Sequence, residues 1–254
     1  MGEIRDVAIE RLDGIMRRDA RDAVVVEAPL QLRARGTPVA TIMRTPGHDL
    51  ELVRGLLHAE GIQPASDIVQ LDQDAVDIDT DESSFVGRGV LATAACGVCG
   101  RAAIADLELR AQEVTSDARA TPAAIAAMPA LLRAAQSTFD QTGGLHAAGL
   151  FSLAPNPALL VAREDVGRHN AVDKVIGWAL GAGLAGDCVL MLSGRAGYEL
   201  VQKAIMFQVP IVASVSAPSS LAIELAERFN VALVGFVRDS RANIYAHGWR
   251  ISGT

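Results

Sequence analysis

Residues 188–216 read CVLMLSGRAGYELVQKAIMFQVPIVASVS, and this stretch decides the expected fold. An apolar strand at 188–192 is followed by a glycine-containing turn, a helix at 198–208 and a second apolar strand at 211–216. Apolar, β-branched strands that alternate with helices are typical of a sheet covered by helices. The stretch therefore predicts a layered α/β domain.

The same alternation extends to both sides of this stretch. The pattern predicts strands at 147–153, 158–163 and 231–237, a short strand at 244–245, and helices at 168–180 and 219–229. Thr121-Pro122 marks a further helix start, because threonine caps helices and proline suits the first helical position. We expect that helix to run towards Phe139 with a kink near Pro129.

The N-terminal part of the chain is richer in strand signals. The pattern predicts a hairpin over 24–45, a helix over 50–60 capped by Asp49, strands at 68–71 and 75–79, and a helix at 101–110. Residues 1–20 are charged and weakly patterned, so they predict a frayed end or a short strand. We expect a smaller strand-rich domain over 1–115 and the α/β domain over 116–254.

Composition narrows the possible classes of function. The chain has 254 residues, half of them hydrophobic, and a net charge of −7, which argues against a nucleic-acid binder. No apolar run is long enough to span a bilayer and the N-terminus lacks a signal-peptide core, so we expect a cytoplasmic protein with no membrane partner. Three cysteines are too few for a disulfide scaffold.

Two of the cysteines, Cys96 and Cys99, lie in the run TAACGVCG at 93–100. Glycine follows each thiol, so the backbone is free to bend and solvent can reach the sulfur atoms. We expect residues 93–101 to be poorly fixed without partners. Taken alone, the pair leaves metal binding, disulfide exchange and sulfur transfer open. The third cysteine, Cys188, begins an apolar strand and is expected to be a small buried hydrophobe.

Two motif matches suggest other chemistry. Residues 181–186 match G-x-G-x-x-G, but a helix precedes them and a strand follows, the reverse of a dinucleotide site. His58-Ala59-Glu60 together with the dithiol mimics a zinc deaminase signature, in which one imidazole and two thiolates hold the metal. Ala95 replaces the proline of that signature, and His58 falls in the last turn of its expected helix. Zinc hydrolysis is therefore the weaker alternative.

Four polar loops are expected at one edge of the sheet, where layered α/β folds bind ligands. They are 143–146, 163–170, 193–197 and 238–243. Glycine-rich turns that open helices present amides to an anion, and Arg195 adds a planar fork suited to phosphate. Asp239 could accept from a guanine edge or cap a turn. These loops predict an anionic, nucleotide-like ligand.

The chain resembles the FdhD family, the sulfur carrier proteins needed for formate dehydrogenase. The resemblance rests on CGVCG at 96–100, REDVGRHNAVDK at 163–174, SGR at 193–195 and FVRD at 236–239. It extends roughly from Glu27 to the C-terminus. It implies a three-layer, cytidine-deaminase-like α/β/α fold for the larger domain, and a homodimer.

The resemblance also implies a function. Sulfur from a cysteine desulfurase is expected as a persulfide on Cys96, with Cys99 as the second catalytic cysteine. The acceptor is the molybdenum cofactor with two pterin guanine dinucleotides, bound as cargo for formate dehydrogenase; no resident metal is expected. The resemblance assigns the cofactor to Phe236, Val237, Arg238, Asp239, Ser240 and Arg241. The polar loops add Ser193, Gly194, Arg195, His146, Arg168 and His169.

Several alternatives remain open at this point. A thioredoxin-like oxidoreductase would cycle a Cys96–Cys99 disulfide without needing a desulfurase. A non-catalytic cofactor chaperone would keep its function after Cys96→Ala. Within the sulfur-transfer reading, Cys99 could relay the sulfur, or it could attack the persulfide and close a disulfide as sulfide departs.

Overall fold

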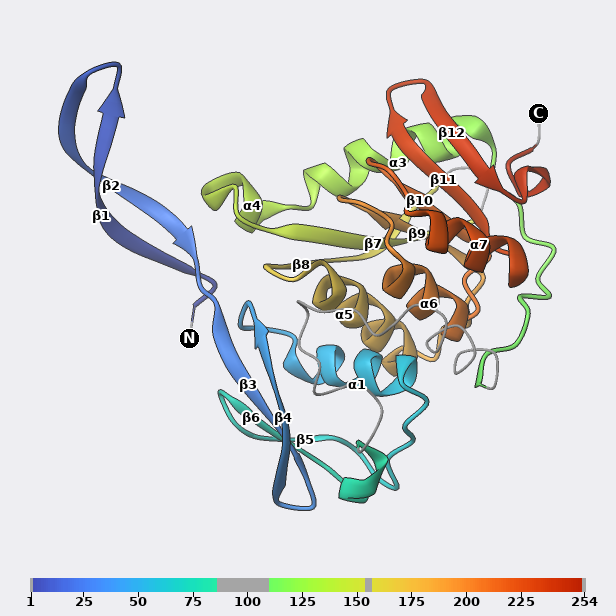
Figure 1. Ribbon diagram of the computed structural model, residues 1–254, viewed down its shortest axis with the longest axis horizontal. Helices are drawn as coiled ribbons and strands as arrows, with labels where there is room; N and C mark the ends of the chain where they lie inside the picture. Colours follow the sequence, from blue (N-terminus) through green and yellow to red (C-terminus); the bar gives the residue numbers. More distant parts are fainter. Residues whose placement is uncertain (1, 86–109, 154–156, 253–254) are drawn as a thin grey trace.

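A six-stranded sheet forms the centre of the molecule (Figure 1). The computed structural model describes residues 2–85, 110–153 and 157–252. The strand order is β12-β11-β10-β9-β7-β8, in which β9, β10 and β11 run parallel. The strands are β7 (His146–Ser152), β8 (Leu159–Asp165), β9 (Cys188–Leu192), β10 (Ile211–Ser214), β11 (Ala232–Arg238) and β12 (Arg241–Ala246).

Helices cover both faces of this sheet, as the alternating pattern predicts. On one face lie α5 (Arg168–Gly181), α6 (Tyr198–Met206) and α7 (Ser220–Arg228), whose apolar side chains join one buried cluster with the sheet. On the other face, Ile125, Met128 and Leu132 of α3 (Pro122–Ala134) join a second cluster. The mixed α/β architecture is confirmed, while the expected likeness to cytidine deaminases stays a prediction.

The long helix expected from Thr121 to Phe139 is in fact two helices. Its start is confirmed, because Thr121 Oγ1 accepts a hydrogen bond from the Ala124 amide at 3.0 Å. Pro129 lies inside α3, but the helix ends at Ala134 and α4 (Ser137–Thr142) follows. The Glu164 carboxylate accepts from the amides of Thr138 and Phe139 at 3.0 and 2.8 Å. These two hydrogen bonds attach α4 to β8 independently of α3.

A four-stranded sheet of order β4-β3-β6-β5 packs on a single helix. The expected hairpin is confirmed as β3 and β4. The elements are β3 (Ala28–Ala34), β4 (Thr37–Arg44), α1 (Asp49–Ala59), β5 (Val69–Asp72), β6 (Ala75–Ile78) and the 3-10 helix η1 (Glu82–Ser84); a second 3-10 helix, η2 (Gly248–Arg250), follows β12 of the larger sheet. The expected cap at Asp49 is wrong. His48 is the cap residue, and both Asp49 oxygens accept from the buried Arg44 guanidinium at 3.0 Å.

The smaller sheet is joined to the larger one through helix α1, which lies against α5 (Figure 1). Two glycines allow the backbones to touch. A Cβ on Gly55 would lie 1.9 Å from the Asp173 carbonyl oxygen, and one on Gly177 would lie 1.8 Å from that of Glu51. The predicted boundary at 115/116 follows Val114, which is buried in the core beneath the larger sheet. That boundary stays a prediction.

Gly177→Ala is expected to destabilise the protein even though alanine is the better helix former by about 1 kcal/mol. The new methyl group must push α1 away from α5, and such overpacking costs about 1–3 kcal/mol or more. Chemical denaturation measures the difference. Gly181→Ala on the same helix is the matched control, because its Cβ meets only the far end of the Arg54 side chain. Equal stability of the two variants would contradict the close packing.

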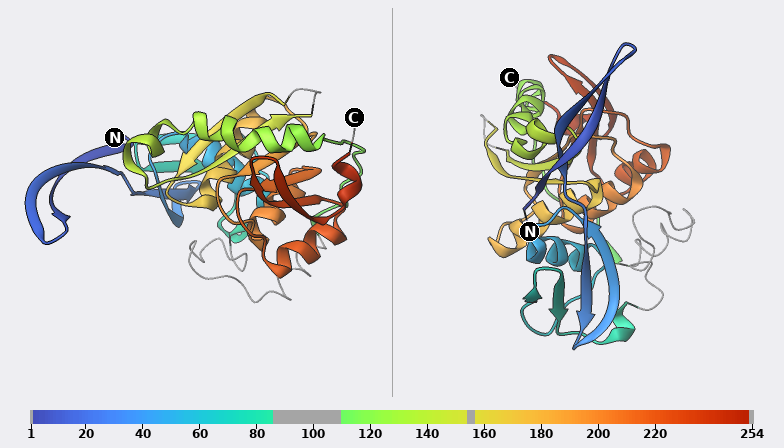
Figure 2. Two further views of the ribbon diagram at one scale, coloured as in Figure 1. Left: turned by 90° about the horizontal axis from the view of Figure 1, so that it is seen from above. Right: turned by 90° about the vertical axis from the view of Figure 1, so that its left-hand side faces the viewer.

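The expectation for residues 1–20 is wrong. They form most of a regular hairpin, β1 (Ile4–Asp13) and β2 (Met16–Val25), paired over ten residues each. This arm projects from the body in Figure 1 and in the left-hand view of Figure 2. Its alternation was hidden because charged residues occupy both faces of a ribbon that has no core to cover. The helix expected at 101–110 and the dithiol segment at 93–101 lie outside the described residues, apart from Arg110.

Candidate functional site

The predicted ligand loops meet at one edge of the six-stranded sheet. The ends of β8 and β9 lie there, and β7 begins there because it runs antiparallel to both. His146 opens β7 opposite Asp165, while Arg168 and His169 open α5 just beyond. Arg195 follows β9 and is exposed. Three loops that are distant in the sequence therefore bring basic side chains to one place.

The pKa of His146 responds to the charged side chains of these loops. Burial lowers the pKa of His146, and the positive charges of Arg168, His169 and Arg195 lower it further. A proton on His146 would add a further positive charge near the two arginines. We call His146, Arg168, His169 and Arg195 the basic cluster. A bound anion would relieve this repulsion.

Glu199, in the first turn of α6, belongs to the same site and was missed from the sequence. Its Oε2 atom lies 2.6 Å from Nε2 of His169. The hydrogen bond from His169 is the main cause that lowers the pKa of Glu199, against the opposing effect of burial. The contact orients the His169 ring. The available signal was an acidic residue in the first turn of a helix that follows a predicted ligand loop.

Ser193 joins the end of β9 to β7, and Gly194 lies next to His146. The Ser193 hydroxyl accepts from the Ala147 amide at 2.7 Å, and the Ser193 amide donates to the Ala147 carbonyl at 3.0 Å. Gly194 lies directly under His146, because a Cβ there would stand 3.3 Å from Nδ1 of the imidazole. Both residues are thus at the site, with the Ser193 side chain engaged by β7.

The stretch from Phe236 to Arg241 lies at the same edge but farther along it. β10 and β9 lie between β11 and β7 in the sheet. At the usual strand spacing, β11 is therefore about 14 Å from β7. Phe236 is exposed and has a left-handed φ of 53°. Val237 is buried in the core, whereas the other four residues are exposed: Arg238, Asp239, Ser240 and Arg241. The expected 238–243 loop is a tight turn at Asp239–Ser240, and β12 starts at Arg241.

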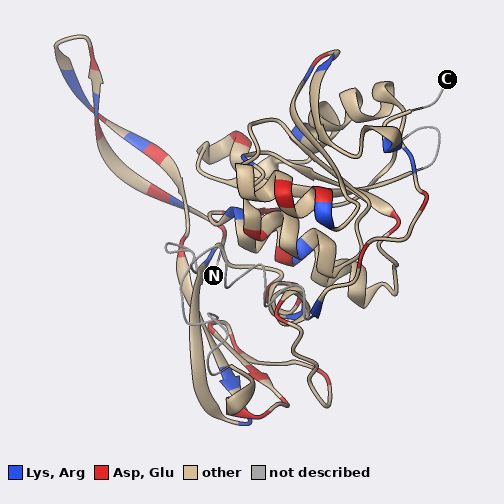
Figure 3. Ribbon diagram, turned by 45° about the vertical axis from the view of Figure 1, so that its right-hand side comes forward, with Lys and Arg blue, Asp and Glu red and all other residues tan. Residues whose placement is uncertain are grey.

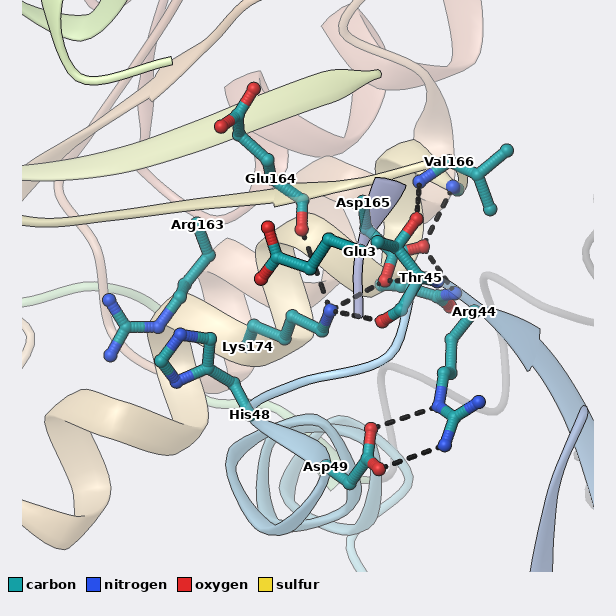
Figure 4. Close-up of polar contacts among 12 residues, drawn as sticks. Glu3, Arg44, Thr45, His48, Asp49, Arg163, Glu164, Asp165, Val166 and Lys174 are labelled. Atoms are coloured by element: carbon teal, nitrogen blue, oxygen red, sulfur yellow. Dashed lines mark hydrogen bonds and ion pairs between the residues drawn. The ribbon is translucent and has the colours of Figure 1, made fainter. Parts of the chain in front are cut away.

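The REDVGRHNAVDK run has a mainly structural role, with Asp165 at its centre (Figure 4). Asp165 is fully buried, and its Oδ2 lies 2.7 Å from Nζ of Lys174. Its two oxygens also accept from the amides of Thr45 and Gly167 and from Asn170 Nδ2, at 2.8–3.2 Å. Lys174 donates in turn to the Thr45 carbonyl at 2.9 Å. The network ties the loop after β4 to the larger sheet.

Other members of the run also bind protein groups. Arg163 forms a bidentate pair with Glu51 of α1 at 2.6 and 2.8 Å. This pair holds the pKa of Glu51 at about 2, although burial acts in the opposite direction. Asp173 is buried and accepts from Lys203 at 2.8 and 3.0 Å. Among the described residues of the run, only Arg168 and His169 belong to the basic cluster.

The described cysteine is Cys188, and its thiol is unreactive. It is 3% exposed, and burial raises the pKa of its thiol to about 12. The expectation of a small buried hydrophobe is confirmed. Cys96 and Cys99 lie outside the described residues.

The zinc deaminase match at His58 and the G-x-G-x-x-G match at 181–186 both have structural explanations. His58 Nε2 lies 3.0 Å from the Met206 carbonyl, which ties α1 to the end of α6. Burial lowers the pKa of His58. Gly181 ends α5 and β9 begins at Cys188, so the G-x-G-x-x-G match is a helix-to-strand turn as expected. The described part of the chain contains no group of three metal-ligating side chains and no helix able to cross a bilayer.

Known proteins resemble this chain over most of its length. It is 44% identical over 253 residues to the Sulfur carrier protein FdhD of Nocardia farcinica, covering 91% of this chain and 88% of that one. It is 43% identical to the protein of the same name from Anaeromyxobacter dehalogenans, covering 92% and 90%. The solved structure of a candidate formate dehydrogenase accessory protein from Desulfotalea psychrophila has the same fold. That match has a TM-score of 0.80 at 23% identity and covers 98% of this chain and 99% of that one.

A family model gives the same assignment. The model described as the FdhD/NarQ family matches residues 25–252, which include the dithiol, the basic cluster and the β11–β12 turn. The matched region is nearly the whole chain and leaves out only the N-terminal arm and the last two residues. On these matches, the chain belongs to the FdhD/NarQ family.

Proposed function

We propose that this protein is a sulfur carrier in the maturation of formate dehydrogenase, with Cys96 as the carrier residue. Relatives at 43–44% identity are named Sulfur carrier protein FdhD. The carrier cysteine is assigned from the burial of Cys188, which excludes that thiol. The chain has three cysteines, so a carrier thiol must belong to the Cys96–Cys99 pair. The family resemblance selects the first of the two.

The proposed donor is a cysteine desulfurase in its persulfide form. The Cys96 thiolate attacks the outer sulfur, which breaks the S–S bond of the donor and forms a new one on Cys96. The donor is left as a thiolate. A free thiol has a pKa of about 8.5 and is mostly protonated at neutral pH, so the reaction requires an environment that favours the thiolate.

The proposed acceptor is the molybdenum cofactor with two pterin guanine dinucleotides, bound as cargo. Release of the outer sulfur as hydrosulfide needs two electrons. Attack by the Cys99 thiolate on the Cys96 sulfur supplies them and leaves a Cys96–Cys99 disulfide. In the alternative relay, Cys99 first takes the outer sulfur and later releases it in the same way. Both routes end with a disulfide that a cellular dithiol must reduce.

The basic cluster is the proposed seat of a cofactor pyrophosphate. Its cationic side chains suit phosphate, and α5 and α6 both begin there without a side-chain cap, so their first amides and dipoles favour an anion. We assign the guanine end to the exposed residues around the β11–β12 turn. The sheet edge between the two regions would then span one dinucleotide.

This proposal predicts a change in the protonation of His146. A bound pyrophosphate offsets the positive charges of Arg168, His169 and Arg195, so GDP should raise the pKa of His146 from its lowered value. A pH titration of the imidazole signals by NMR, with and without GDP, measures the shift. His58 is the internal control, because its pKa is lowered by burial rather than by nearby cations. An unchanged His146 pKa at saturating GDP would rule out a phosphate at the cluster.

Mass spectrometry tests the carrier role directly. After incubation with a cysteine desulfurase and cysteine, the peptide that contains Cys96 should gain one sulfur atom. A dithiol oxidoreductase would instead show only the Cys96–Cys99 disulfide, and a zinc enzyme would show bound metal. If no extra sulfur reaches either cysteine of the pair from an active donor, the proposed function is wrong.

A further inference from the structure

Glu199 is an acidic side chain at a site that is otherwise basic. Its Oε2 atom lies 2.6 Å from Nε2 of His169, and 44% of the side chain is exposed. The hydrogen bond from His169 and the positive charge of Arg168 lower the pKa of Glu199, so the carboxylate is ionised at neutral pH. A negative charge therefore lies beside the proposed seat of the cofactor pyrophosphate, where it acts on any anion that binds.

The two helices that begin at the basic cluster differ in the charge of their first turns. The first turn of α5 contains no acidic residue, whereas that of α6 contains Glu199. A carboxylate near a helix N-terminus balances part of the helix dipole. The N-terminus of α5 is therefore left for the phosphates of a ligand, while α6 already has an anion of its own.

The nearest cation on α6 is bound elsewhere. Lys203 lies one turn beyond Glu199, but it donates to both oxygens of the buried Asp173 at 2.8 and 3.0 Å. Acidic and basic residues are interspersed on the helices that cover this face of the sheet (Figure 3). The charge of Glu199 therefore acts mainly on the basic cluster.

The net charge of the site follows from these contacts. Arg168 and Arg195 contribute two positive charges. The pair of His169 and Glu199 adds none, because the carboxylate offsets the imidazole when that ring is protonated. His146 adds little at neutral pH, since burial and the neighbouring cations lower its pKa. The site therefore matches a ligand whose phosphates carry about two negative charges.

Phosphates differ in charge according to their place in a nucleotide. Each phosphate inside a dinucleotide is a diester and carries about one negative charge, whereas a terminal phosphate carries roughly 1.5 to 2 at neutral pH. An internal pyrophosphate therefore balances the two arginines. The triphosphate of GTP exceeds them by about two charges.

We propose that Glu199 determines the ligand specificity of the basic cluster, favouring an internal pyrophosphate over the terminal phosphates of free guanine nucleotides. This inference rests on the proposed function and gives a reason for a carboxylate at an anion site. Selection of this kind works by repelling the wrong ligand. A carrier of a guanine dinucleotide cofactor needs it, because free guanine nucleotides have the same base as the cargo.

Nucleotide binding to the full-length chain tests this role, with GDP-mannose as the probe for an internal pyrophosphate. Isothermal titration calorimetry should show that the parent chain binds GDP-mannose more tightly than GTP. Glu199→Gln keeps an oxygen that can accept from His169 but removes the charge. It should therefore raise the affinity for GTP roughly tenfold more than the affinity for GDP-mannose. Glu199→Asp retains the charge and should keep the preference of the parent.

The matched control is Glu227→Gln, which removes an exposed carboxylate near the far end of α7. It should leave the preference between the two nucleotides unchanged, and circular dichroism should show every variant folded. An unchanged preference in Glu199→Gln, or the same change in the control, would overturn the proposal and leave the carrier function in place. Equal weakening of both nucleotides by Glu199→Gln would also overturn it, because the carboxylate would then bind the ligand rather than select it.

One further outcome separates this proposal from the proposed function. If the parent chain binds neither nucleotide, the pyrophosphate seat is wrong and the role of Glu199 falls with it. The gain of a sulfur atom on Cys96 does not depend on that seat, so the carrier role would still be decided by mass spectrometry.

Discussion

Replacing Cys96 with alanine is expected to abolish sulfur transfer and, with it, the formation of active formate dehydrogenase. The buried Cys188 cannot take over, because a thiol with a pKa of about 12 supplies almost no thiolate at neutral pH. The loss should therefore be complete within the detection limit. The measurement is formate dehydrogenase activity in cells whose own copy of this protein has been deleted and replaced by the variant.

Two further cysteine variants make this result specific. Cys188→Ala removes a thiol from the same chain and should keep full activity, since its role is packing. Cys99→Ala should still gain the sulfur atom on Cys96. If Cys99 resolves the persulfide, that variant should accumulate sulfur and fail to release it. Full activity of Cys96→Ala would identify the protein as a cofactor chaperone that only binds and delivers.

The order of helices and strands in the larger domain could be predicted because each buried strand is a short apolar run between turn residues. Strands such as Cys188–Leu192 and Ile211–Ser214 are buried on both faces, so all of their residues are apolar or small and the run can be recognised without knowing its neighbours. The β1–β2 arm could not be predicted in this way. Its side chains are solvated on both faces, so hydrophobic alternation, the main signal for a strand, is absent.

The candidate site could be predicted only in part, for a different reason. The polar loops were found because glycine and arginine follow predicted strands, and the parallel order brings those loops together. The roles of Asp165 and Lys174 could not be found, because their partner Thr45 lies 120 residues before Asp165 in the sequence. A local motif does not show which of its polar residues face a ligand and which face another part of the chain. The structure shows that Asp165, Asn170 and Lys174 face another part of the chain, whereas the ligand-facing role of Arg168 and His169 stays a prediction.

The interior role of that second group leads to a large expected effect on stability. Lys174→Met should lower the free energy of unfolding by about 3–5 kcal/mol, because it leaves the buried Asp165 carboxylate without its cation. The methionine is close in volume to the lysine, so the loss of packing is small. The Thr45 carbonyl also loses a donor. Urea unfolding, followed by circular dichroism, measures the change.

Two further variants test whether the loss of stability in Lys174→Met comes from the buried carboxylate left unpaired, or from the loss of any positive charge. Arg17→Met breaks the exposed pair with Glu10, whose side chains are 70% and 55% accessible, and should change stability by less than about 0.5 kcal/mol. The double variant Asp165→Asn with Lys174→Met should lose at least about 1 kcal/mol less than the two single losses combined, since each single change strands the other partner. If Lys174→Met unfolds at the same urea concentration as the parent, the Asp165 network does not hold the two sheets together. The charges of the run would then have to be explained by the ligand site, and Lys174 would have to reach it by a rearrangement of the loop after β4.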